Sequence, residues 1–212
     1  SLLAMGSAVL LAGSVSVFLR QRALFTFTLA AGVASWLVGN LLWLAGFSIF
    51  EVVPWWAGFL VLTIAGERLE LSRFLPPSPV AQRVFIGVLA GLTFGMAFQP
   101  QVFGAALLVL ALWLLRQDIA RRTVKDTGLT RFIAVCLLSG YAWLALAGAI
   151  MLAAGLAPGN AAYDAALHAL MLGFVFSMVF GHAPIIFPAV LRVAVPYHPL
   201  FYAPLALLHL SL

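Results

Sequence analysis

The stretch HALMLGFVFSMVFGHAPIIFPAVL, from His168 to Leu191, decides the fold class of this chain. It carries no acidic residue, lysine or arginine, and it exceeds the roughly 20 apolar residues that a helix needs to cross a bilayer. It also holds two of the four histidines of the chain, His168 and His182. The stretch therefore predicts a transmembrane helix and raises the question of why ionisable side chains lie inside it.

The composition of the whole chain places it in the same class. Hydrophobic residues make up 65% of the 212 positions and charged residues only 8%, with a mean hydropathy of +1.14. A soluble domain needs far more charged surface, so we expect an integral membrane protein in contact with the lipid bilayer. The net charge of +5 comes without a basic, aromatic patch or any nucleic-acid motif, and we expect no nucleic-acid partner.

Apolar runs divide the chain into about seven spans and the beginning of an eighth near Leu200. The expected fold class is an all-α, polytopic transmembrane helix bundle of seven to eight spans, forming one domain over residues 1–212. Both ends look like those of a fragment, since the chain opens with Ser1 and stops at Leu212 while still apolar. The predicted spans are Leu2–Leu19, Leu24–Phe47, Val52–Phe74, Val84–Phe98, Val102–Leu115, Phe132–Leu156 and Ala161–Leu191.

The basic residues of the loops predict the orientation. Lysine and arginine concentrate in cytoplasmic loops, and here they occupy every second connection. This alternation places the N-terminus outside, Lys125 in the cytoplasm and Asn160 on the opposite side. The loop cations are Arg20, Arg22, Arg68, Arg73, Arg83, Arg116, Arg121, Arg122, Lys125, Arg131 and Arg192.

A charged cluster ends the third span in the sequence AGERLELSRFLPPSP. If the helix continues through it, Glu67 and Glu70 lie one turn apart on one side. One interpretation is a cytoplasmic ion-pair cluster of little energetic value. The other is a proton or quinone-headgroup site formed by Glu67, Arg68 and Glu70, because carboxylates within a leaflet are costly and tend to have a function.

His168 forms a candidate metal site with Asp164, four residues earlier on the same helix turn. A carboxylate in this position can orient an imidazole whose other nitrogen binds a metal, although an ordinary interfacial pair has the same spacing. His182 follows 14 residues later, roughly 21 Å along an α-helix. The two histidines would share a helix face but could not share one metal ion.

His182 and His209 form a candidate haem site. On neighbouring antiparallel helices, both lie roughly 15 Å from the cytoplasmic end, at matched depth for the axial ligands of a b-type haem. Phe174, Phe176, Phe180 and Phe187 would supply an aromatic wall. A histidine that only bonds to a neighbouring helix, or a helix bent by Pro184 and Pro188, is the competing interpretation.

Two segments resemble a known family: SGYAWLALAGAIMLAAGL and ALHALMLGFVFSM, within Ser139 to Met178. They are similar to the C-terminal part of the NnrS-like haem–copper membrane proteins, at Tyr141, Trp143, His168, Gly173 and Met178. The resemblance implies a multi-pass bacterial inner-membrane protein that binds haem, with copper as a second metal, and is linked to nitrogen-oxide metabolism. After Met178 the chain departs from the family pattern, reading GHAPIIFPAVLRVAVPYHPL.

The sequence is therefore compatible with three functions. The first is a haem-binding protein of redox or electron-transport metabolism, with His168, His182 and His209 as cofactor ligands. The second is a structural subunit that binds other membrane subunits, favoured by the glycine face of Gly87, Gly91 and Gly95. The third is a small-solute transporter with a broken seventh helix. No nucleophile, base and orienting acid occur together, so the sequence leaves enzymatic activity open.

Overall fold

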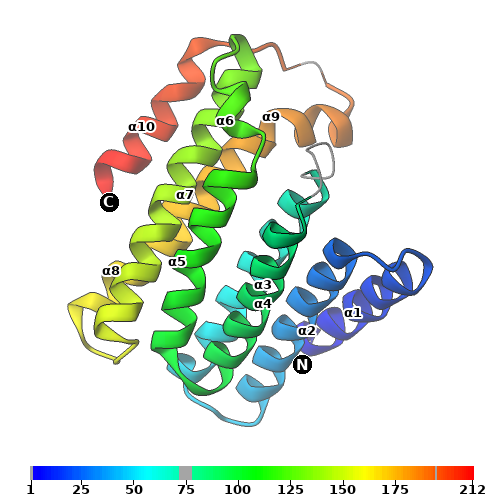
Figure 1. Ribbon diagram of the computed structural model, residues 1–212, viewed down its shortest axis with the longest axis vertical. Helices are drawn as coiled ribbons and strands as arrows, with labels where there is room; N and C mark the ends of the chain where they lie inside the picture. Colours follow the sequence, from blue (N-terminus) through cyan, green and yellow to red (C-terminus); the bar gives the residue numbers. More distant parts are fainter. Residues whose placement is uncertain (1, 72–77, 194) are drawn as a thin grey trace.

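The computed structural model is an all-α bundle and describes residues 2–71, 78–193 and 195–212. Seven of its helical segments are long and apolar enough to cross a membrane, which confirms the predicted fold class (Figure 1). These segments are α1 Leu2–Arg20, α2 Leu24–Leu44, α3 Ile49–Leu71, α4 Pro79–Phe98, α5 Pro100–Gln117, α7 Gly128–Ala154 and Ala161–Leu191.

The predicted spans agree with these helices to within a few residues at most ends. The end of the third span at Phe74, and the loop cation Arg73, lie outside the described residues. The connection between α5 and α7 contains one short helix, α6 Ala120–Thr123. The predicted eighth segment consists of the 3-10 turn η3 Pro199–Phe201 and helix α10 Tyr202–Ser211.

Local sequence signals set the helix ends. Ser78 caps α4 by accepting a hydrogen bond from the Ala81 nitrogen, and Pro79 follows at the first helical position, where its missing N–H costs nothing. Asn160 caps the helix after α7 in the same way, through the Ala162 nitrogen. Gly155 ends α7 with a φ of 69°, a conformation that glycine adopts without steric cost.

The seventh span changes its winding twice. It begins as α8 Ala161–Leu167, continues as a π-helix, η2 His168–Phe176, and ends as α9 Ser177–Leu191. A π-helix bonds residue i to i+5 and holds more residues per turn than an α-helix. The shared face predicted for His168 and His182 assumed continuous α-helix, and η2 rotates the two residues out of that register.

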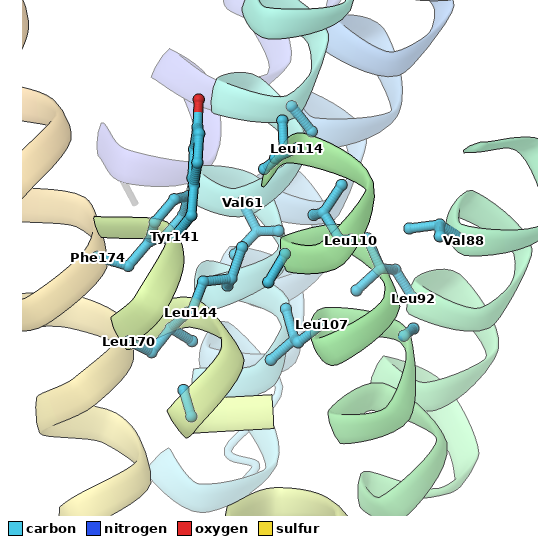
Figure 2. Packing of buried hydrophobic residues seen from close by; sticks show 14 of the residues in the cluster. Val61, Val88, Leu92, Leu107, Leu110, Leu114, Tyr141, Leu144, Leu170 and Phe174 are labelled. Carbon is cyan, nitrogen blue, oxygen red and sulfur yellow. The ribbon is translucent and has the colours of Figure 1, made fainter. Parts of the chain in front are cut away.

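The main core lies between α3, α4, α5, α7 and η2, whereas α1 covers one side of α2 and packs on no other element as closely. Figure 2 shows part of this core, where Leu107 and Leu110 of α5 lie between Leu92 of α4 and Leu144 of α7. A second, smaller cluster joins Phe132 and Cys136 of α7 to Leu205 of α10.

Glycines allow the helices of the core to approach closely. A Cβ built on Gly104 would lie 2.5 Å from the Leu152 nitrogen, and one on Gly148 would lie 2.6 Å from the Leu108 nitrogen. This α5–α7 contact was not predicted. Of the predicted glycine face, Gly95 is equally crowded, by Phe103, whereas a Cβ on Gly87 would meet nothing within 4 Å.

Two of the connections that carry basic residues lie at one end of the bundle. In Figure 1 the α5–α7 connection with α6 and the α9–α10 connection lie together at the top, opposite the α7–α8 turn. Lys125 and Asn160 thus flank opposite ends of α7, as the loop charges predicted. Which end faces the cytoplasm stays a prediction.

Candidate functional site

A buried polar contact joins α3 to α9. Arg68, near the end of α3, is buried with 7% of its surface exposed. Its Nη2 lies 2.8 Å from Nε2 of His182 on α9. The sequence predicted separate roles for these residues, Arg68 in a proton or quinone site and His182 as a haem ligand, and the structure brings them together.

The neighbours of His182 fix its tautomer. Nδ1 lies 2.5 Å from the main-chain oxygen of Met178, an acceptor, so Nδ1 carries the proton. The arginine is a donor only, so Nε2 accepts from it. His182 is therefore a neutral imidazole whose two nitrogens both have protein partners.

Asp118, which ends α5, supplies the opposite charge. Its Oδ2 lies 3.9 Å from Nη1 of Arg68 and accepts a 2.6 Å hydrogen bond from the Tyr141 hydroxyl of α7. Its Oδ1 accepts from the Ala120 nitrogen at 2.7 Å. Figure 2 shows the Tyr141 hydroxyl directed away from the apolar side chains of Leu144 and Leu170. A buried charge is tolerated only with such partners, and these tie α3, α5, α7 and α9 into one polar network.

One donor of this network has no partner among the described residues. The Nε–H of Arg68 is buried, and no hydrogen-bond acceptor for it occurs among the described residues. A buried donor left unpaired costs roughly 1–3 kcal/mol, more when it belongs to a charged group. Such an atom calls for an explanation, and a bound ligand is one.

Arg68 and His182 form part of the wall of a groove between α3 and the η2–α9 segment. The groove has a volume of about 520 Å³, within the range of roughly 300–1,000 Å³ for small-molecule sites. Its remaining walls are mainly apolar, including Leu60, Ile64 and Val175. Its rim lies on the outer surface of the bundle, where Val179 and Ile186 are each half exposed.

Glu67 and Glu70 also line this groove, at the same end as Arg68. Glu67 is exposed and Glu70 half-buried. The structure thus places all three residues of the predicted proton or quinone site on one groove. It adds His182, which the sequence assigned elsewhere.

His209 of α10 contacts α7 instead of α9. The Trp143 indole Nε1 donates to its Nδ1 at 2.8 Å, and its Nε2 lies 3.1 Å from the Ser139 Oγ. The Trp143 and His209 rings also stack, with centroids 6.1 Å apart. Because indole nitrogen only donates, Nε2 of His209 carries the proton.

The described geometry does not fit a haem between His182 and His209. All four ring nitrogens already have protein partners, whereas an axial ligand needs a free nitrogen lone pair. The aromatic wall is divided as well, since Phe174 is fully buried in the core and Phe176 is 46% exposed. Phe180 and Phe187 line an apolar cavity of about 200 Å³ against α10, smaller than a usual cofactor site. Haem ligation stays a prediction from the sequence.

His168 and Asp164 are both exposed, near the start of the seventh span. Nδ1 of His168 lies 2.7 Å from the main-chain oxygen of Asp164, so its partner is the backbone and not the predicted carboxylate. Within residues 2–71, 78–193 and 195–212, no three histidine, cysteine or acidic side chains are grouped to hold a metal ion. The metal site, copper included, stays a prediction.

Sequence reasoning missed Asp118 as a site residue. It lies in the loop RQDIARRTVKDTGLTR, which reads as a solvated connection. A single acidic residue directly after a span, among many basic ones, was the available signal. Tyr141 entered only through the family resemblance, and its spacing from Asp118 indicates no contact.

One family model matches this chain over residues 1–212, that of a domain of unknown function (DUF8744). This match provides no link to the NnrS-like proteins that the two C-terminal segments resemble. The search of curated proteins finds no match, and the search of solved structures finds none either. Because the match covers the whole sequence, the chain belongs to the DUF8744 family.

Proposed function

We propose that this membrane protein binds a lipid-soluble ligand of the quinone class in the groove between α3 and α9. The observation that carries the proposal is the buried Nε–H of Arg68. It has no acceptor among the described residues, and Arg68 forms part of the groove wall. A ring carbonyl oxygen would supply that acceptor once the Arg68 side chain turns its Nε–H, which is buried in the described structure, toward the groove.

The walls of the groove favour a ligand that arrives through the bilayer. Apolar side chains of α3 and α9 form most of the lining, and its rim opens on the surface that faces lipid. Because lipid is as apolar as the groove, an isoprenoid tail adds mainly shape complementarity. The contacts of the polar headgroup then determine the position at which the ligand binds.

The charges favour a neutral, hydrogen-bond-accepting headgroup over an anion. Asp118 already balances the guanidinium charge of Arg68. Glu67 and Glu70 add carboxylates at the same end of the groove, and these repel a phosphate or carboxylate ligand. A quinone carbonyl accepts a hydrogen bond without adding charge.

The test is binding of decylubiquinone and a short-chain menaquinone to the purified protein in phosphatidylcholine nanodiscs. We expect Val179→Trp, which places a large side chain on the groove rim, to weaken binding at least 10-fold. Val190→Trp is the matched control, because Val190 is an exposed residue of the same helix (71%) that does not line the groove.

Arg68→Lys tests the headgroup contact separately, since it keeps the charge near Asp118 but removes the Nε–H donor. A lost charge-assisted hydrogen bond of about 1.5–3 kcal/mol corresponds to roughly a 10- to 150-fold weaker affinity. The proposal fails if the wild-type protein binds neither quinone, or if Val179→Trp and Val190→Trp behave alike.

A further inference from the structure

A second cavity lies at the connection between α5 and α7, and the groove site makes no use of its basic residues. It has a volume of about 310 Å³ and is lined by Arg116, Asp118, Arg121, Arg122 and Lys125. Arg116 belongs to the last turn of α5, and α6 carries the two adjacent arginines. Four cations and one carboxylate thus surround a space large enough for a small anion.

Among the described residues, none of the four cations has an acidic partner. The ion pair of the polar network joins Arg68 to Asp118, and none of the four cavity cations takes part in it. All four side chains are exposed at the surface. Cations collected around one cavity repel each other unless an anion enters, and guanidinium groups match phosphate oxygens in geometry.

Asp118 does not neutralise the cavity, because its oxygens have other partners. Oδ1 accepts from the Ala120 nitrogen, and Oδ2 accepts from Tyr141 and faces Arg68 at 3.9 Å. Arg68 is a buried cation outside the cavity lining and compensates the charge of Asp118. The positive charge of the cavity therefore remains in excess.

The backbone that carries the cations is held in place. Ala120 is fully buried and anchors α6 to the core. Main-chain hydrogen bonds join Arg122 to Ile119 at 2.8 Å, Val124 to Ala120 at 2.9 Å and Lys125 to Arg122 at 3.1 Å. A fixed backbone lowers the conformational entropy that an anion-binding loop loses when its ligand binds.

We propose that this cavity binds a phosphate group, carried either by the headgroup of an anionic lipid or by a soluble phosphate. Its place at the membrane end of α5 brings lipid headgroups within reach, and basic pockets at this level bind anionic lipids in other membrane proteins. The site is independent of the groove, because a quinone bound between α3 and α9 would touch none of the four cations.

The experiment titrates the detergent-solubilised full chain with phosphatidylglycerol, inorganic phosphate or phosphatidylcholine and follows thermal stability. Phosphatidylcholine is the control ligand, since its choline cation offsets its phosphate. We expect Arg121→Gln/Arg122→Gln to weaken the response roughly 10- to 30-fold, since each cation near a membrane contributes about a fivefold factor. The single variant Lys125→Gln should weaken it in the same direction.

The matched control is Arg20→Gln/Arg22→Gln, which removes two exposed cations from the α1–α2 connection. A response to phosphatidylglycerol alone, lost only in the cavity variants, assigns the phosphate to a lipid. Saturation by inorganic phosphate, lost in the same variants, assigns it to a soluble ligand. The proposal is overturned if neither ligand stabilises the protein, or if the control variant loses as much as the cavity variant. Quinone binding is a separate measurement and tests only the groove.

Discussion

Arg68 donates a 2.8 Å hydrogen bond to Nε2 of His182, a residue 114 positions away in the chain. This contact joins the third span to the seventh through an arginine that is 7% exposed. It explains why a histidine lies inside an apolar run: a neutral imidazole offers the acceptor that a buried guanidinium needs. The groove, the polar network and the position of Asp118 all depend on it.

Loss of this acceptor should destabilise the protein. In His182→Ala the Nη2 of Arg68 loses its partner, and we expect the free energy of unfolding to fall by about 1–3 kcal/mol. His182→Gln, whose side-chain oxygen can accept a hydrogen bond, should keep a large part of the free energy of unfolding that His182→Ala loses. Unfolding in mixed detergent micelles measures both variants, and equal stability of His182→Ala and wild type would exclude a structural role for the contact.

The α5–α7 contact should tolerate no added side chain. Gly148→Ala places a methyl group against the Leu108 backbone, and overpacking of this kind costs about 1–3 kcal/mol. Gly87→Ala is the control, since nothing lies within 4 Å of a Cβ at Gly87 and alanine favours helix. The changes in melting temperature of the two variants, relative to the wild type, should differ in sign or clearly in size. Similar melting temperatures would contradict this packing.

Labelling of introduced cysteines should show the orientation of α7. With an impermeant thiol reagent, Lys125→Cys should react from the cytoplasmic side and Asn160→Cys from the opposite side, because the loop cations alternate. The native Cys136 is fully buried and should stay unlabelled in the parent protein. Reaction of both introduced cysteines from one side would show that α7 does not cross the membrane.

An optical spectrum of the protein purified from its native host tests the haem hypothesis directly. Because the ring nitrogens of His182 and His209 bond to Arg68, Trp143 and neighbouring oxygens, we expect no Soret band. If a Soret band appears and is lost in both His182→Ala and His209→Ala, but not in His198→Ala, the two histidines rearrange to bind haem.

Replacement of the Asp164 side chain should leave the hydrogen bond of His168 unchanged. The His168 ring bonds to the main-chain oxygen of Asp164, which Asp164→Asn preserves, and an exposed substitution of this kind changes stability by less than about 0.5 kcal/mol. A titration of copper into the wild type and this variant, followed by thermal stability, should give matching curves. A copper-dependent shift in the wild type that the variant lacks would show that the carboxylate takes part in a metal site.

The sequence by itself determined the number of spans and most of their limits. The bilayer sets the length of an apolar helix, and every backbone N–H and C=O in hydrocarbon must bond within that helix. Both constraints act on consecutive residues, so Leu24–Leu44 and Pro100–Gln117 could be located without knowledge of their neighbours. The alternation of loop cations likewise follows from the order of the spans alone.

Only the tertiary structure decided which side chains meet. The spans are apolar on nearly all sides, so hydrophobic periodicity does not show which face is inside. The π-helical turn after His168 then rotates the rest of the seventh span. Arg68 could therefore be placed at a helix end from the sequence, whereas its contacts with His182 and Asp118 arise from the packing of α3, α5 and α9. Those contacts depend on relative rotation and spacing, which glycine approaches such as Gly104 to Gly148 set across the bundle.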